Sequence, residues 1–286
     1  MKILVTGGAG FIGTNLIKRL LKEGHQVLSI DDYSTGSKEN EVSGCEYIDG
    51  KVEHIKTYSK LNIHFDLIYH LAGLSRIQPS FNNPQETFNV NTGGTQSVCE
   101  FARLNNAKVV YAGSSSKWHN PYQSPYSTYK YLGEEICKMY KLTYGMNIEI
   151  ARFYNVYGPH EVIDGDWAAV IGIWRRQVRD GQKITIVGDG EQRRDFTHVE
   201  DICDALWRVG MKNEKHEDAW ELGTGMNYSI KEVFRMFLDR YQHIESKFIP
   251  DQSGNYRKTL RENDDSLERL EWKPSDKLRE YILNLK

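Results

Sequence analysis

The chain has 286 residues, and its 37 lysines and arginines against 39 aspartates and glutamates give a formal net charge of -2. This balance gives no electrostatic support for binding to nucleic acid or to an anionic membrane, and no apolar run approaches the roughly 20 residues of a membrane span. The four cysteines form no paired motif and the nine histidines show no ligand spacing, which predicts reduced thiols and no metal site. Because Met1 runs directly into an apolar strand, we expect no signal peptide and a cytoplasmic protein.

The first thirty residues have the layout of a dinucleotide-binding unit. The pattern predicts a strand over 2–6, a glycine-rich turn over 7–13, a helix over 14–23 and a strand over 26–30. A pyrophosphate bound at this turn would sit on the free N–H groups at the positive end of the helix.

Each glycine of the turn has a separate role. Gly7 allows the tight turn off the strand, Gly10 lets the backbone approach a pyrophosphate, and Gly13 lets the helix pack against the sheet. Asp31 stands 18 positions after Gly13, close to the spacing of roughly 20 that is typical of a ribose-binding acid. The alternative is that these glycines form only a loop.

The acidic end of the second strand favours NAD over NADP. A carboxylate at Asp31 would accept hydrogen bonds from a ribose 2′-hydroxyl and repel a 2′-phosphate. Asp32 adds a second negative charge, and no lysine or arginine follows before Lys38.

Strands and helices alternate over the first half of the chain, which predicts a parallel sheet with helices on both faces. Further strands are expected over 46–48, 65–70, 108–112 and 147–153, and helices over 84–105 and 124–144. The rhythm breaks after residue 159. We therefore expect an α/β fold, with a Rossmann-like doubly wound parallel sheet and a smaller C-terminal α/β substrate lobe. The NAD-binding domain would comprise residues 1–157 with 197–212, and the substrate lobe residues 158–196 with 213–286.

Tyr126 and Lys130 stand four positions apart in the predicted helix over 124–144, so their side chains share a face. A nearby ammonium and a positive nicotinamide ring would lower the pKa of the tyrosine from about 10, which suits a general acid/base at a sugar hydroxyl. Chance also produces such pairs, as at Tyr47 and Lys51. Position favours Tyr126, because its helix follows the fifth strand at the carboxyl edge of the sheet.

A run of three serines begins at Ser114, directly after the fifth predicted strand. A hydroxyl at this position could hydrogen-bond both a substrate oxygen and Tyr126. The alternative is that the serines belong to a solvated loop or cap a helix.

The assembled motifs resemble those of the extended short-chain dehydrogenase/reductase group, namely the NAD-dependent nucleotide-sugar epimerase/dehydratase family, and are most like those of UDP-sugar 4-epimerases. The extra residue between Gly7 and Gly10 is typical of this superfamily. The other segments that carry the resemblance are 31–36, 70–73, 152–159, 168–171, 188–196 and Asn91 ahead of Gly94.

The resemblance implies a complete set of site residues. The catalytic residues would be Ser114, with Ser115 as the fallback, Tyr126 and Lys130. The substrate would be bound by Ser114, Asn155, Val170 and Arg194, of which Asn155 and Arg194 would hold a diphosphate. NAD would be held by Gly7, Gly10, Phe11, Ile12, Asp31, Asp32, Leu71, Ala72, Gly73, Asn91, Ala112, Tyr126, Lys130 and Tyr154.

The resemblance also implies a reaction. Dehydratases of the family carry an acidic pair just after the catalytic serine, where this chain has Ser115 and Ser116. We therefore expect a nucleotide-sugar 4-epimerase that acts on a UDP-sugar through a transient 4-keto sugar. The alternatives are a nucleotide-sugar dehydrogenase or 4-ketoreductase with net cofactor turnover, a sugar-nucleotide dehydratase, and a protein that binds NAD without catalysis.

A homodimer is expected as well. In the family, the two helices predicted over 84–105 and 124–144 pair with those of a second copy in a four-helix bundle. Candidates for the apolar face between the copies are Cys99, Phe101, Cys137 and Tyr140, and the alternative is that these residues pack against the sheet.

The sequence departs from the family pattern at three places. The loop over 117–124 is short and carries Trp118 where tyrosine is common. The third strand ends Asp49-Gly50, with the usual order of these two residues reversed. Gln252 stands where a second arginine for the diphosphate is usual, and Arg257 or Arg261 could replace it. These departures leave the sugar and the nucleotide open.

Overall fold

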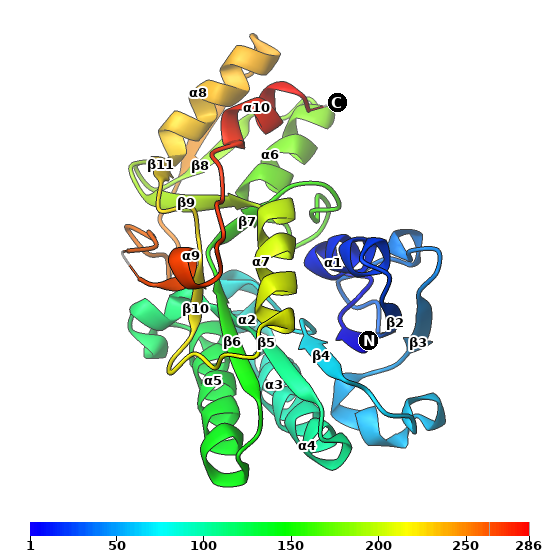
Figure 1. Cartoon of the computed structure of the whole chain (residues 1–286). Helices are drawn as coiled ribbons and strands as arrows, with labels where there is room; N and C mark the ends of the chain where they lie inside the picture. The colour runs from blue at the N-terminus through cyan, green and yellow to red at the C-terminus, as the bar shows by residue number, and fades with distance from the viewer. Residues whose placement is uncertain (263, 286) are drawn as a thin grey trace.

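The computed structural model describes residues 1–262 and 264–285. Within this part of the chain, seven parallel strands form a central sheet in the order β10-β6-β5-β4-β1-β2-β3 (Figure 1). From β1 the chain adds β2 and β3 on one side and then returns to add β4, β5 and β6 on the other side. This change of direction beside β1 is the signature of a doubly wound fold. The strands are β1 (Lys2–Thr6), β2 (Gln26–Asp31), β3 (Glu46–Asp49), β4 (Leu67–His70), β5 (Lys108–Ser114), β6 (Ile148–Phe153) and β10 (Trp220–Leu222).

Helices cover both faces of this sheet. Successive residues of a strand point to opposite sides, and in this sheet both sides carry apolar side chains that the helices bury. Leu4 packs in the core beneath α4 (Thr95–Asn105) and α5 (Pro125–Tyr144). Its neighbours Ile3 and Val5 pack in the opposite core, beneath α1 (Phe11–Lys22) and α7 (Val199–Met211). The predicted Rossmann-like α/β fold is confirmed.

The helix predicted over 84–105 is interrupted. A π-helical turn over Asn89–Gly94 separates α3 (Pro84–Phe88) from α4. Within the turn, the buried amide of Asn91 accepts a 2.8 Å hydrogen bond from Leu74 N–H and donates one of 2.9 Å to its carbonyl. The wider turn therefore ties the helix to the loop that follows β4, as π-turns near functional sites often do.

A smaller α/β unit stands at the carboxyl ends of the central strands, at the upper end of Figure 1. Within the described residues it has its own apolar core, which includes Trp174, Phe196 and Phe237. Its strands are β7 (Asn155–Tyr157), β8 (Ile184–Val187), β9 (Arg193–His198), β11 (Asn227–Ser229) and β12 (Ser246–Ile249), and its helices are α6 (Val170–Arg179), α8 (Ile230–Tyr241) and α10 (Leu278–Leu283). Two further short helices are α2 (Ile77–Asn82) and α9 (Ser266–Arg269).

Each of the two units has a short strand that lies outside the residue range predicted for it. β10 belongs to the segment 213–286, which we expected in the lobe, but it pairs with β6 and extends the central sheet. The reason is apolar burial, since Trp220 and Leu222 are fully buried in the core beneath α7. In turn, β7 lies within 1–157 but pairs with β9 of the lobe. The division into the two stated domains stays a prediction, to which these strands are exceptions.

The residues predicted to form an apolar face towards a second copy are wrong. Cys99, Phe101, Cys137 and Tyr140 are all at most 5% exposed and belong to the core between the sheet and α4 and α5. They face inward because the two helices pack on the sheet through this stripe. Apolar side chains that do reach the surface on the same helices are Leu104, Leu132, Met139 and Leu142.

None of the described helices combines the length and the apolar character needed to cross a membrane.

The close packing of the glycine turn predicts a sharp difference between two Gly→Ala variants. A Cβ at Gly13 would lie 2.1 Å from the Gly7 carbonyl oxygen and 2.7 Å from Gly8 Cα, both of them backbone atoms. Gly13→Ala is expected to destabilise the protein by about 1–3 kcal/mol, as overpacking does. Gly93→Ala is the control, because a Cβ there would meet no atom within 4 Å. Thermal unfolding should show a lower Tm for Gly13→Ala alone, and equal Tm values would contradict the prediction.

Candidate active site

A cavity of about 720 Å³ opens at the carboxyl ends of the central strands and extends to the smaller lobe. The residues that line it include every predicted site residue except Asn91. Val90, the neighbour of Asn91 in the chain, lines the cavity instead. Asn91 instead holds the loop after β4, through both of its bonds to Leu74. The structure thus brings together residues from positions 7 to 194, while their individual roles remain predictions.

The glycine turn leaves a cradle for an anion. Gly7 has φ +74°, and a Cβ there would lie 2.8 Å from the backbone nitrogen of Ala72. Gly10 is the N-cap of α1, and no side chain caps this helix or places an acid in its first turn. The free N–H groups and the helix dipole therefore meet the cavity without a competing carboxylate. This arrangement fits a pyrophosphate.

Asp31 is fixed at the end of β2. Its carboxylate accepts 2.8 Å hydrogen bonds from the N–H groups of Ala9 and Tyr33. Burial raises the pKa of Asp31, and the backbone hydrogen bonds oppose this. Each oxygen keeps a lone pair for a ribose hydroxyl, so the geometry fits the predicted role.

The reversed dipeptide at the end of β3 has a structural consequence. Gly50 lines the cavity, whereas Asp49 points its carboxylate to the surface and pairs with Lys38 at 3.4 Å. Among the described residues, the acids at this end of the cavity are therefore Asp31, Asp32 and Glu53.

The three predicted catalytic side chains converge on one wall. Tyr126 Oη donates to Ser114 Oγ at 3.3 Å, and Lys130 Nζ donates to the carbonyl oxygen of Ala112 at 2.5 Å. Ser115 also lines the cavity, but the hydroxyl that receives the tyrosine is Ser114.

Local sequence explains why α5 begins where it does. Ser124 is the N-cap and accepts a 3.1 Å hydrogen bond from Ser127 N–H, and Pro125 occupies the first turn. Tyr126 N–H donates to Ser80 Oγ of α2 at 3.1 Å. Tyr126 is therefore held in the first turn, where both α2 and β5 contact it.

The electrostatics differ from the sequence expectation. Burial raises the pKa of Tyr126, while the hydrogen bond to Ser114 and the charge of Arg76 lower it. Lys130 is not among the groups that shift the pKa of Tyr126, and its ammonium donates to the Ala112 carbonyl. Burial lowers the pKa of Lys130 to about 8, and Glu134 raises it. Arg76 is thus a residue of the site that the sequence did not single out, since it follows the recognised segment 70–73 without a motif of its own.

The predicted diphosphate ligands lie in the smaller lobe. Asn155 donates from its amide to the Asp195 carbonyl at 3.1 Å and to Thr259 Oγ1 at 2.9 Å, so its amide oxygen is the group left for a ligand. Arg194 lines the cavity, and burial lowers its pKa to about 10. Within residues 1–262 and 264–285, no carboxylate lies within ion-pair distance of Arg194.

The two candidate replacements for the arginine missing at Gln252 lie elsewhere. Arg257 is 66% exposed and pairs with Asp189 at 2.9 Å. Arg261 is buried and donates to the Gly223 carbonyl at 2.8 Å. Neither lines the cavity, whereas Gln252 does. The expected replacement is therefore not observed.

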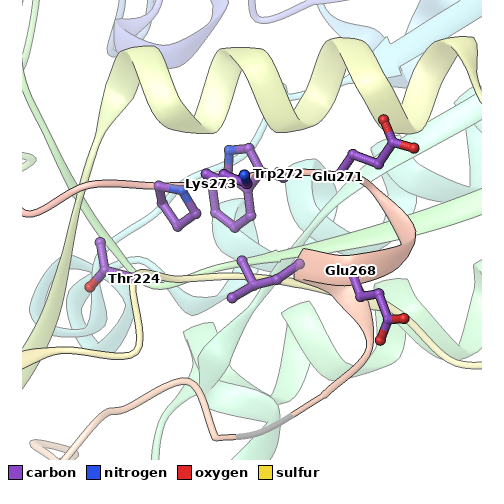
Figure 2. Close-up of a pocket in the computed structure, with 7 residues that line it drawn as sticks. Thr224, Glu268, Glu271, Trp272 and Lys273 are labelled. Carbon is purple, nitrogen blue, oxygen red and sulfur yellow. The ribbon is translucent and has the colours of Figure 1, made fainter.

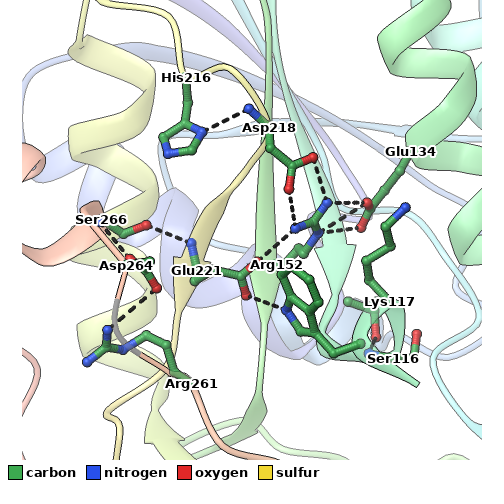
Figure 3. A network of polar contacts seen from close by, with 12 residues as sticks. Ser116, Lys117, Glu134, Arg152, His216, Asp218, Glu221, Arg261, Asp264 and Ser266 are labelled. Atoms are coloured by element: carbon green, nitrogen blue, oxygen red, sulfur yellow. Dashed lines mark hydrogen bonds and ion pairs between the residues drawn. The ribbon is translucent and has the colours of Figure 1, made fainter.

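The shortened loop is held by aromatic and polar contacts. His119 stacks on Tyr256 with ring centroids 3.8 Å apart. Trp118 Nε1 donates to Glu221 at 3.2 Å, and the Arg152 guanidinium lies over its ring. Arg152 is fully buried and pairs with Glu221 at 2.8 Å and with two further carboxylates, those of Glu134 and Asp218 (Figure 3).

A second cavity, of about 820 Å³, is lined by Thr224 and by residues of the segment 267–274, and it lacks comparable chemistry. Figure 2 shows the carboxylates of Glu268 and Glu271 pointing away from Thr224 and from each other, so its polar groups do not converge.

Comparison with known proteins agrees with the geometry of the first cavity. The sequence pattern of the NAD dependent epimerase/dehydratase family matches residues 3–223. The chain belongs to this family. NAD is its cofactor, and the glycine turn, the uncapped start of α1 and Asp31 fit that molecule.

Three relatives show the range of activities near this chain. It is 32% identical over 306 residues to the UDP-glucose 4-epimerase of Mycolicibacterium smegmatis, with 99% of this chain and 96% of that protein covered. It is 28% identical to the UDP-glucuronic acid decarboxylase 1 of Arabidopsis thaliana, with 99% and 68% covered. The solved structure of the UDP-glucose 4-epimerase of Thermotoga maritima with UDP-glucose matches with a TM-score of 0.92 at 25% identity, with 99% and 96% covered.

Lys130 is expected to titrate near pH 8, because burial lowers its pKa to about 8. Lysine-selective NMR should show this transition in the folded protein and lose it in Lys130→Met. Lys108, whose pKa burial also lowers to about 8, is the internal control and should keep its own transition in that variant. Because Glu134 raises the pKa of Lys130, Glu134→Gln should move the midpoint to lower pH. A midpoint near the ordinary value of about 10.4 would contradict the burial of the ammonium.

Proposed function

We propose that this protein is a nucleotide-sugar 4-epimerase that acts on a UDP-sugar through a transient 4-keto sugar. The observation that carries the proposal is the 3.3 Å contact between Tyr126 Oη and Ser114 Oγ in a cavity that also reaches the glycine turn and Arg194. One cavity therefore offers a proton-transfer pair, a cradle for NAD and a cation for a diphosphate.

The chain supplies proton transfer and orientation. Tyr126 would take the proton of the sugar 4-hydroxyl and return it after the ring has turned over, with Ser114 holding the same oxygen by a hydrogen bond. NAD, held by the glycine turn and Asp31, would supply the acceptor and donor for the hydride of the 4-carbon. Lys130, bound to the Ala112 carbonyl, places a positive charge on the wall behind the tyrosine. Arg194 and Asn155 would keep the diphosphate in place during the turn, since a guanidinium meets phosphate oxygens bidentately.

The residues beside Ser114 support epimerisation over dehydration. Elimination of water needs an additional acid and base near the sugar. Ser115 and Ser116 are both buried and carry hydroxyls where dehydratases have an acidic pair. A net dehydrogenase or 4-ketoreductase is the alternative, which the assay below separates from an epimerase.

We also propose a homodimer formed through α4 and α5. Leu132 and Met139 of α5 are 36% and 40% exposed, and they lie seven residues apart on one side of the helix. Leu104 of α4 and Leu142 of α5 are 61% and 84% exposed. Burying such side chains against a second copy would remove apolar surface from water. The cytoplasmic location stays a prediction from the sequence.

Tyr126→Phe should lower turnover by roughly 10²–10⁴-fold, because it removes the proton acceptor. Tyr144→Phe is the control, since this tyrosine stands at the exposed end of the same helix. Both variants should retain NAD. The assay incubates the protein with UDP-glucose, UDP-N-acetylglucosamine or UDP-glucuronate without added NAD and follows the products by proton NMR.

A 4-epimer formed by the wild type and lost in Tyr126→Phe supports the proposal. Unchanged turnover in this variant would remove Tyr126 from the mechanism. Products that form only with added NAD, together with a rise in absorbance at 340 nm, would identify a net oxidoreductase instead.

Replacing both Leu132 and Met139 by glutamate should convert a dimer into monomers, because two charges would be buried at the interface. Light scattering after gel filtration at micromolar concentration measures the change. Phe248→Glu is the control, since this exposed side chain lies on β12 of the other lobe. A wild-type protein that is monomeric under these conditions would rule out the proposed dimer.

A further inference from the structure

We propose that Arg76 selects nucleotide sugars that carry a negative charge on the sugar ring itself, such as the carboxylate of a uronate. This inference rests on the proposed function and names the substrate class of the same site.

Arg76 is fixed on the cavity wall beside the catalytic tyrosine. It lines the cavity and occupies the N-cap position of α2. Its Nε donates to the carbonyl oxygen of Trp167 at 2.9 Å, which holds the guanidinium against the loop that leads into α6. The same short helix contributes Ser80, whose hydroxyl accepts the N–H of Tyr126 at 3.1 Å. The helix thus connects the guanidinium directly to the first turn of α5.

The charge of Arg76 lacks an anionic partner in the protein. In the part of the chain that the structure describes, no carboxylate lies within ion-pair distance of its guanidinium. The acid whose charge influences it is Glu161. One carboxylate oxygen of Glu161 accepts hydrogen bonds from Arg175 and Tyr281, each at 3.0 Å, and the other has no hydrogen-bond partner among the described residues. Burial lowers the pKa of Arg76, which means that the charged form is poorly solvated. A ligand carboxylate would satisfy this charge through a bidentate pair.

The position of Arg76 points to the sugar and not to the diphosphate. The charged and titratable neighbours of Arg194 are Tyr256, Arg257 and Asp251 of the C-terminal lobe, and His119 of the short loop. Those of Arg76 are different, namely Tyr126 and Glu161. The two guanidiniums therefore serve different parts of the cavity.

The geometry of a hexose shows which part of the substrate each of the two guanidiniums would contact. In a pyranose ring, the carbon that carries the diphosphate lies opposite the 4-carbon at which Tyr126 acts. The carboxylate of a uronate is attached to the 5-carbon, next to the reacting 4-carbon. A guanidinium beside Tyr126 is therefore at the end of the ring formed by the 3-, 4- and 5-carbons, within reach of that carboxylate, while Arg194 would hold the opposite end.

The test measures binding to the NAD-loaded protein by titration calorimetry, with UDP, UDP-glucose and UDP-glucuronate as the three ligands. The variant Arg76→Gln keeps a donor for the Trp167 carbonyl but removes the charge. Arg76→Lys keeps the charge but loses the planar fork. Arg179→Gln is the matched control, because this arginine lies on the surface and pairs with Asp164. NAD binding and Tm confirm that each variant is folded.

We expect Arg76→Gln to weaken the binding of UDP-glucuronate by roughly 10- to 100-fold, the range for a lost charged hydrogen bond. Binding of UDP and UDP-glucose should change by less than about threefold, and Arg76→Lys should recover part of the loss. An equal loss for all three ligands would place Arg76 at the diphosphate and overturn the proposal. No loss for UDP-glucuronate would overturn it too. If the wild type binds none of the three ligands, the proposed function itself fails.

Discussion

The buried charge of Arg152 is the constraint on which the site depends. It lies in β6 and binds Glu134 of α5, Glu221 of β10 and Asp218, so a single guanidinium joins two central strands to the catalytic helix. Loss of one partner of a buried ion pair typically destabilises a protein by about 3–5 kcal/mol, because the other charge stays uncompensated. The elements around Arg152 are therefore held in one arrangement.

This arrangement determines where the reacting groups stand. Glu134 is one helical turn beyond Lys130, so fixing Glu134 against Arg152 fixes the register of α5 on β5. The same network receives Tyr154, whose hydroxyl donates to Glu221 at 2.9 Å, and the indole of Trp118 from the short loop. Arg152, which organises the framework, is thus separate from Arg76 and Arg194, which line the cavity.

Two acids and two arginines of the cavity differ in the hydrogen-bond and ion-pair partners that the protein gives them. Asp31 accepts backbone hydrogen bonds, and Glu161 is paired with an arginine. Arg76 and Arg194 instead donate only to carbonyl oxygens among the described residues. Guanidiniums that lack a carboxylate partner favour an anionic ligand, as a nucleotide sugar is. The relatives of the chain are named for reactions of such molecules, and our proposal makes Arg76 the residue that selects among them.

The sequence by itself determined the parts of this protein that depend on local spacing. The glycine turn, Asp31 and the pair formed by Tyr126 and Lys130 could be read directly, because a strand, a turn and a helix fix their own geometry over a few residues. Ser114 could be placed beside Tyr126 because parallel strands bring their carboxyl ends to one edge of the sheet.

Only the tertiary structure decided the features that depend on packing between distant segments. β10 joined the central sheet because Trp220 and Leu222 needed burial, and Cys99 and Cys137 faced the sheet and not a second copy. Arg257 lies outside the cavity, whereas Arg76 lies within it. No periodicity shows which face of a helix meets the core, or which of several arginines is left without a carboxylate, because both depend on residues far away in the chain.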